Sequence, residues 1–187
     1  MELPMTAFTL GGSNGSISLE IGEVFGFPDE TAYGGGYGAR GPLRIHVQTC
    51  AATWTVDADH FFTTGELNRF EKELARCYET LGGTATLENC ENELELTLSV
   101  GKTGHVTIAG KFQELSEFDI VLHFQIESDQ TYIPKALSQL RRVTEAFGDH
   151  SDKPVWASIP LEKPSVPAGP ITWMIRFCLK LLLRRSG

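Results

Sequence analysis

The chain has 187 residues, of which 41% are hydrophobic and 21% charged, so it can form one core-bearing domain plus a smaller appendage and is too apolar for a wholly disordered protein. Residues 1–150 contain 10 Lys/Arg and 22 Asp/Glu, a net charge of −12, whereas residues 151–187 contain 6 and 2, a net charge of +4. Because an acidic body repels phosphate, this charge argues against nucleic acid as a partner and favours a basic protein.

Residues 1–15 end in a glycine-rich run and are predicted to be a loose N-terminal lead-in. They have neither a basic start nor a long apolar run, so we expect no signal peptide and a cytoplasmic location. The four cysteines (Cys50, Cys77, Cys90 and Cys178) form no C-x-x-C pair, which favours reduced, mostly buried thiols over a zinc site or a disulfide framework.

Alternating apolar residues predict strands over residues 16–24 and 42–49, and β-forming residues predict a hairpin partner over 52–57. A helix follows, with Thr63 as its N-cap, Glu66 completing a capping box, and Gly82 and Gly83 at its end. Its apolar residues fall at helical spacing on one face.

Three further strands are predicted over residues 93–100, 105–112 and 118–127, with a short one over 85–88. A second amphipathic helix covers about 132–147, because Pro134 fits only in the first turn of a helix and Gly148 ends it. The predicted fold is α+β: a two-layer domain over residues 16–148, with a mainly antiparallel sheet of about six to seven strands and two amphipathic helices on one face.

Residues 149–170 contain many prolines and are predicted to be a linker. Residues 171–187 are predicted to form a basic amphipathic helix, because Arg176, Lys180 and Arg184 lie four residues apart on one face. Its uncharged runs are too short to span a bilayer. Two alternatives are open for this helix. It packs on the domain or on another copy of it, or its residues 171–185 make a peripheral contact with an anionic membrane. The oligomeric state does not follow from the sequence.

A glycine-rich stretch, TAYGGGYGARGPL, covers residues 31–43. It lacks the Gly-Lys-Ser/Thr of a phosphate loop, and its G-x-G-x-x-G letters lead into Pro42 and a strand, where no helix N-terminus can hold a pyrophosphate. It is therefore interpreted as a long β-connection. Tyr33, Tyr37 and Arg40 are candidates for contact with a protein partner, since such residues are favoured anchors in interfaces.

The acidic and histidine residues show few of the spacings that are typical of catalytic or metal sites. Asp57, Asp59 and His60 lie together in the sequence, and they are the residues of an alternative hypothesis, a small metal-dependent enzyme. No H-x-H or H-x-x-x-H pair supports a metal, and no cofactor is expected. The remaining acidic cluster is interpreted as a solvated face that could contact a basic partner: Glu88, Glu91, Glu93 and Glu95.

The order of these elements, together with several short phrases, resembles the WapI-like immunity proteins of bacteria. The phrases are ISLEIGEV followed by FGFP, then LRIHVQT leading to ATWTVDADHFFTTGELNRFEKEL, and finally ELELTLSV and FDIVLHFQIESDQTYI before a closing helix. The segment Gln130-Thr131-Tyr132-Ile133 at the start of that helix is especially similar. The resemblance covers about residues 16–148.

The resemblance implies a cytoplasmic immunity protein without catalytic residues, which binds and neutralises the toxin domain of a polymorphic or contact-dependent toxin. In such systems the toxin is often a nuclease, and a basic toxin surface would suit an acidic inhibitor. The chain departs from the family pattern at the glycine-rich residues 31–41 and beyond Phe147, so the details of partner choice do not carry over.

Overall fold

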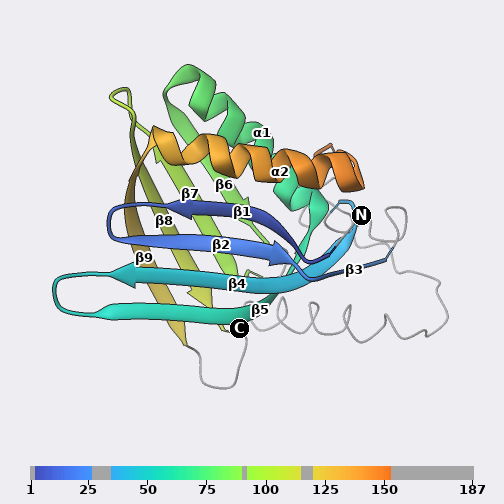
Figure 1. Ribbon diagram of the computed structural model, residues 1–187, viewed down its shortest axis with the longest axis horizontal. Helices are drawn as coiled ribbons and strands as arrows, with labels where there is room; N and C mark the ends of the chain where they lie inside the picture. Colours follow the sequence, from blue (N-terminus) through green and yellow to red (C-terminus); the bar gives the residue numbers. More distant parts are fainter. Residues whose placement is uncertain (1–2, 27–34, 90–91, 115–119, 153–187) are drawn as a thin grey trace, which may run out of the picture.

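The computed structural model describes residues 3–26, 35–89, 92–114 and 120–152. Nine strands form two antiparallel sheets, and two α-helices lie along one side of the pair (Figure 1). The predicted α+β class is confirmed. The expectation of one sheet with six to seven strands is wrong, because alternation along a strand identifies its buried face but not the sheet to which it belongs.

Sheet A holds five strands: β1 (Met5–Gly11), β2 (Gly15–Ile21), β3 (Glu23–Phe25), β4 (Gly38–Gln48) and β5 (Thr53–Thr63). One side of β4 pairs with β2 and then β3, and its full length pairs with β5. Since a strand has only two edges, β5 must occupy the second edge of β4, and it therefore lies at the border of the sheet.

Strand β1 corrects the expectation of a loose lead-in over residues 1–15. Met5–Gly11 pairs with β2, and Ala7, Phe8 and Leu10 are fully buried. An irregularity in the pairing between Thr6 and Phe8 leaves two consecutive residues facing the core, which breaks the alternation that would have revealed the strand.

Sheet B is a meander of β6 (Gly83–Glu88), β7 (Leu94–Val100), β8 (His105–Gln113) and β9 (Val121–Asp129). The strands of sheet A cross in front of those of sheet B in Figure 1. The apolar faces of the two sheets meet, and the core includes Ile45 of β4, Leu96 of β7 and Ile126 of β9.

Helix α1 (Thr64–Thr80) begins and ends close to its predicted limits. Thr63 is the N-cap, and the capping box with Glu66 is present. Helix α2 (Ile133–Phe147) follows a short 3₁₀ turn, η1 (Gln130–Tyr132), carries Pro134 in its first turn and stops at Gly148. Both helices were predicted because their signals are local.

The helices do not cover the face of a single sheet as predicted. Helix α1 packs along β6 and helix α2 along β1, and the two helices contact each other. They thereby close one open side of the space between the sheets. The rings of Phe8 in β1 and Phe70 in α1 lie 5.7 Å apart across this boundary, so helices and sheets share one core.

The predicted linker (149–170) and basic helix (171–187) lie outside the described residues, apart from the first four residues of the linker. No described helix is long and apolar enough to cross a membrane. Of the cysteines within the described ranges, Cys77 is buried as expected, and burial raises the pKa of its thiol, whereas Cys50 is exposed.

Candidate functional site

A groove of about 480 Å³ runs along the border strand β5. Residues 55–60 of β5 form one wall, and residues near the ends of β7, β8 and β9 form the other. The chain leaves sheet A after β5, passes through α1 and β6, and returns beside β5 at Asn89 and Glu93. Its position is therefore set by contacts between distant parts of the sequence.

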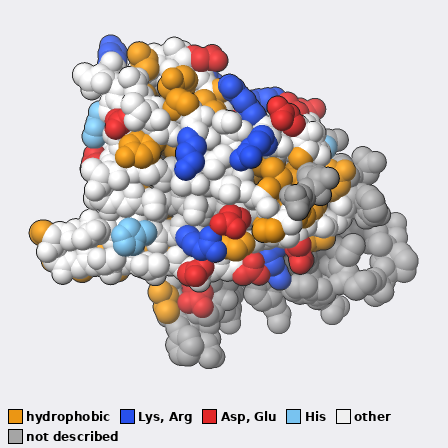
Figure 2. Space-filling view, viewed as in Figure 1, with side chains coloured by type: hydrophobic (Ala, Val, Ile, Leu, Met, Phe, Trp, Pro, Cys, Tyr) orange, Lys and Arg blue, Asp and Glu red, His pale blue; other side chains and the backbone are white. Residues whose placement is uncertain are grey.

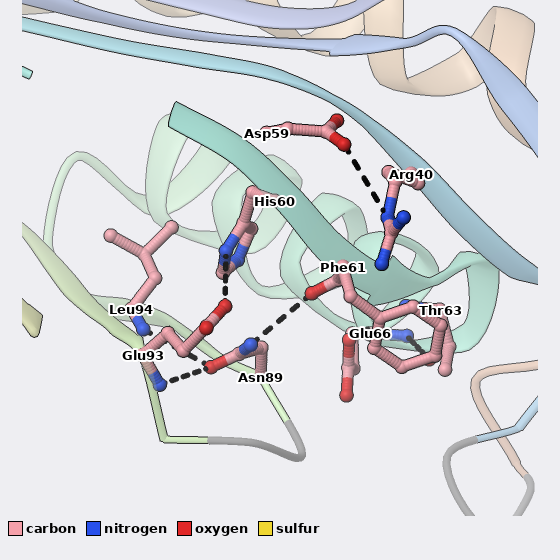
Figure 3. Close-up of polar contacts among 9 residues, drawn as sticks. All are labelled: Arg40, Asp59, His60, Phe61, Thr63, Glu66, Asn89, Glu93 and Leu94. Atoms are coloured by element: carbon pink, nitrogen blue, oxygen red, sulfur yellow. Dashed lines mark hydrogen bonds and ion pairs between the residues drawn. The ribbon is translucent and has the colours of Figure 1, made fainter. Parts of the chain in front are cut away.

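The inner end of the groove is a hydrogen-bonded junction between the sheets (Figure 3). Asn89, buried before the turn into β7, donates through Nδ2 to the carbonyl of Phe61 in β5, at 3.2 Å. Its Oδ1 accepts from the N–H groups of Glu93, at 2.9 Å, and Leu94, at 3.1 Å. One side chain thus connects β5 to the start of β7.

The buried ring of His60 also crosses this junction. Its Nδ1 lies 3.0 Å from Oε2 of Glu93, and the two side chains are 1% and 19% exposed. Sequence reasoning placed Glu93 on a solvated face by extending the alternation of β7, but β7 begins at Leu94 and Asn89 turns the preceding chain toward β5. No local pattern in the sequence predicts the contact between His60 and Glu93.

On the opposite face of β5, the acidic residues are held by arginines from β4. Arg40 Nε lies 3.5 Å from Asp59 Oδ2, and Arg44 reaches Asp57 at 3.7 Å and Glu20 at 2.6 Å. The face of the molecule in Figure 2 accordingly shows acidic and basic side chains side by side rather than one acidic patch.

The geometry does not support the alternative metal-dependent enzyme. His60 points into the interior, whereas Asp57 and Asp59 point outward, because neighbouring residues of a strand face opposite sides. Figure 3 shows His60 and Asp59 directed to opposite sides of β5. The described residues contain no cluster of three His, Cys, Asp or Glu side chains that could hold a metal ion.

The predicted partner-binding residues do not form one site. Arg40 and Glu93 lie beside the groove, but Tyr37 is half-buried against Phe147 and His150, with ring centroids 5.8 and 5.9 Å away. Glu88 and Glu95 are paired neighbours on sheet B, where Glu95 binds Lys111 at 3.0 Å. Tyr33 and Glu91 lie outside the described residues. Whether any of these residues contacts a partner stays a prediction.

The groove also contains residues that sequence reasoning did not select. Its apolar lining includes Val56, Phe112, Ile120 and Leu122, and Ile120 is 55% exposed. Apolar side chains that gather in one groove, rather than lie scattered over the surface, are typical of a contact site. The only signal in the sequence was that these residues belong to strands, which by itself favours burial.

A scan against protein-family models matches the immunity protein WapI-like family over residues 8–148. The chain belongs to the WapI-like immunity protein family. The match confirms the resemblance and covers both sheets and both helices, except the first residues of β1. Membership in this family suggests a role in immunity to a toxin, with a protein toxin as the general kind of partner. No curated protein matches the chain.

Proposed function

We propose that this WapI-like protein is a cytoplasmic immunity protein that binds a basic toxin domain, a nuclease, and blocks it without chemistry of its own. The single observation that carries the proposal is the family match over residues 8–148. The charge of −12 over residues 1–150 supports it, because an acidic inhibitor attracts a basic partner and competes with nucleic acid for that partner's surface.

The arrangement around β5 also supports binding over catalysis. A general base or metal site needs side chains that converge on one point, whereas His60, Asp57 and Asp59 are directed to separate partners. The groove instead combines apolar side chains, of which Ile120 is exposed, with carboxylates around them, and protein interfaces have such an apolar centre within a polar rim.

The experiment requires a toxin candidate, which is the C-terminal domain of a large secreted protein whose gene neighbours that of the immunity protein. We expect that domain to be toxic when produced alone, harmless when the full immunity chain is produced with it, and bound to that chain in size-exclusion chromatography. Persistent toxicity together with separate elution of the two proteins would contradict the proposal.

A titration separates a stoichiometric inhibitor from an enzyme. Nuclease activity of the toxin domain, measured at nanomolar concentrations, should fall in proportion to added immunity protein and reach its minimum at one equivalent. Full protection at a small fraction of one equivalent would show turnover and would refute the non-enzymatic mechanism. An unrelated protein of similar size and net charge serves as the control for non-specific electrostatic effects.

A further inference from the structure

Three outer strands, β1, β6 and β9, have outward backbone groups that are hydrogen-bonded to other elements. On β1, the Thr9 N–H donates to Gln139 Oε1 of α2 at 2.8 Å. On β6, the Thr86 N–H donates to Glu73 Oε2 of α1 at 2.8 Å. Each helix therefore satisfies backbone groups that would otherwise form an open edge.

The edge of β9 is covered by the turn between β1 and β2. Asn14 Oδ1 accepts from the Glu127 N–H at 2.8 Å, and the Ser13 N–H donates to the Glu127 carbonyl, also at 2.8 Å. Asn14 Nδ2 adds a bond to the carbonyl of Gln125 at 3.1 Å.

Among the described residues, those that hydrogen-bond to the outer edge of β5 do so at its C-terminal end. Asn89 binds the carbonyl of Phe61, and Glu66 Oε2 accepts from the Thr63 N–H at 2.8 Å. The next N–H, that of Thr64, points the other way and donates to the Tyr37 carbonyl beside β4. Odd-numbered residues of β5 therefore direct their backbone groups away from β4.

By the same alternation, Thr55, Asp57 and Asp59 present their N–H and C=O groups to the groove. All three residues are exposed. Within the described ranges, no hydrogen bond reaches these outward backbone groups from another element. An open edge of this kind is a template for one more strand.

The groove beside this edge has a defined chemical character. Val56, Ile120 and Leu122 supply apolar surface. Four acidic residues are part of its lining: Asp57, Asp59, Glu93 and Glu114. Among the described residues, no lysine or arginine lines the groove, and Arg40 and Arg44 pair with Asp59 and Asp57 from β4.

We propose that an extended segment of the toxin pairs with residues 55–59 of β5 and becomes an additional strand of sheet A. This inference rests on the proposed function and names the surface and the chemistry of its partner. Backbone hydrogen bonds would supply affinity, and alternate side chains would supply specificity. The segment carries apolar residues facing Val56 and Leu122, alternating with Lys or Arg facing Asp57 and Asp59, because side chains of adjacent strands match face to face.

The test measures the affinity of the full chain for the toxin domain encoded beside its gene. Asp57→Pro removes one outward N–H but no backbone hydrogen bond to β4, so it should weaken binding about tenfold or more. Asp57→Asn keeps that N–H and should weaken binding by only about threefold, through the lost charge. Thr84→Pro is the matched control: Thr84 is exposed on β6, and its N–H also points away from the ladder, like that of Thr86. It should leave affinity unchanged.

Hydrogen exchange of the wild-type complex provides a second measurement that needs no variant. The amides of Thr55, Asp57 and Asp59 should exchange more slowly with the toxin bound. If Asp57→Pro binds like wild type, or if these amides exchange equally fast in the complex, the strand-addition proposal is wrong while the immunity function stands. If the wild-type chain forms no complex with the toxin domain, the proposed function itself fails.

Discussion

Asn89 shows how one buried polar residue can hold two sheets together. Its amide makes three hydrogen bonds, to the Phe61 carbonyl and to the N–H groups of Glu93 and Leu94. Buried polar groups need such partners, because removing a polar group from water without a new hydrogen bond destabilises the folded chain. The residue therefore fixes the corner of the chain that places Glu93 against His60.

Replacing Asn89 with Ala should lower the free energy of unfolding by about 2 kcal/mol, because a buried backbone group of Leu94 and partly buried ones of Phe61 and Glu93 would lose their partner. Urea denaturation followed by circular dichroism measures the change. The control is Glu88→Gln at an exposed neighbouring position, which should have little effect. Equal midpoints for the two variants would show that the Asn89 bonds contribute nothing to stability.

Asp149 and Lys72 form an ion pair near the end of α2, with Nζ and Oδ2 2.7 Å apart. The hydrogen bond from Lys72, followed by those from Ser151, lowers the pKa of Asp149 from 3.8 to about 2. A carboxyl whose pKa is lower in the folded chain stabilises the fold above pH 3.8, and this contribution disappears as the pH falls through about 2.

Asp149→Asn should therefore be slightly less stable than wild type at neutral pH, and the difference should vanish as the pH falls below about 2. The difference is small, because both side chains are about half exposed and water screens the pair. Thermal unfolding across this pH range measures the effect, with Asp152→Asn as the control. If the difference in unfolding temperature between wild type and Asp149→Asn persists below about pH 2, the pKa assigned to Asp149 is contradicted.

At the scale of the elements, the turn between β1 and β2 connects sheet A to the edge of β9. Residues 12–14 pack against β9, and a Cβ added to Gly12 would lie 2.2 Å from the Glu127 carbonyl oxygen. Glycine is required here because two backbones approach closely. The turn holds the two sheets at their observed separation.

Gly12→Ala should destabilise the fold by about 1–3 kcal/mol, since the turn must move away from β9 and its hydrogen bonds to Glu127 must lengthen. Gly82→Ala is the control, because the nearest atom to its added Cβ lies 3.9 Å away. Chemical denaturation of both variants gives the comparison. A Gly12→Ala chain as stable as Gly82→Ala would mean that the contact between turn and strand is loose.

At the scale of the whole molecule, charge should control how fast the protein finds its partner. The electrostatic field of the net charge of −12 over residues 1–150 acts at distances longer than any single contact. Under the proposed function, the rate of association with the toxin domain should fall about tenfold or more between low and physiological salt, while dissociation changes little. Stopped-flow fluorescence measures both rates. An association rate independent of salt would remove electrostatic attraction from the mechanism.

The sequence by itself determined the features that arise from neighbouring residues. The limits of α1 follow from Thr63 and Glu66, and those of α2 from Pro134 and Gly148, because caps and helix breakers act within one turn. The alternation of β7 and β8 predicted their buried faces for the same reason. The phrases shared with WapI-like proteins identified the family, which the family match confirmed.

Only the tertiary structure decided which strands share a sheet and where the groove lies. The junction of Phe61, Asn89 and Glu93 joins residues about 30 positions apart, and the turn at Asn14 covers residues of β9 more than 100 positions away. Such contacts depend on how complete sheets and helices pack, and no pattern within a short window of sequence encodes them. The open edge of β5 is a result of that packing, because it depends on which elements come to lie beside β5.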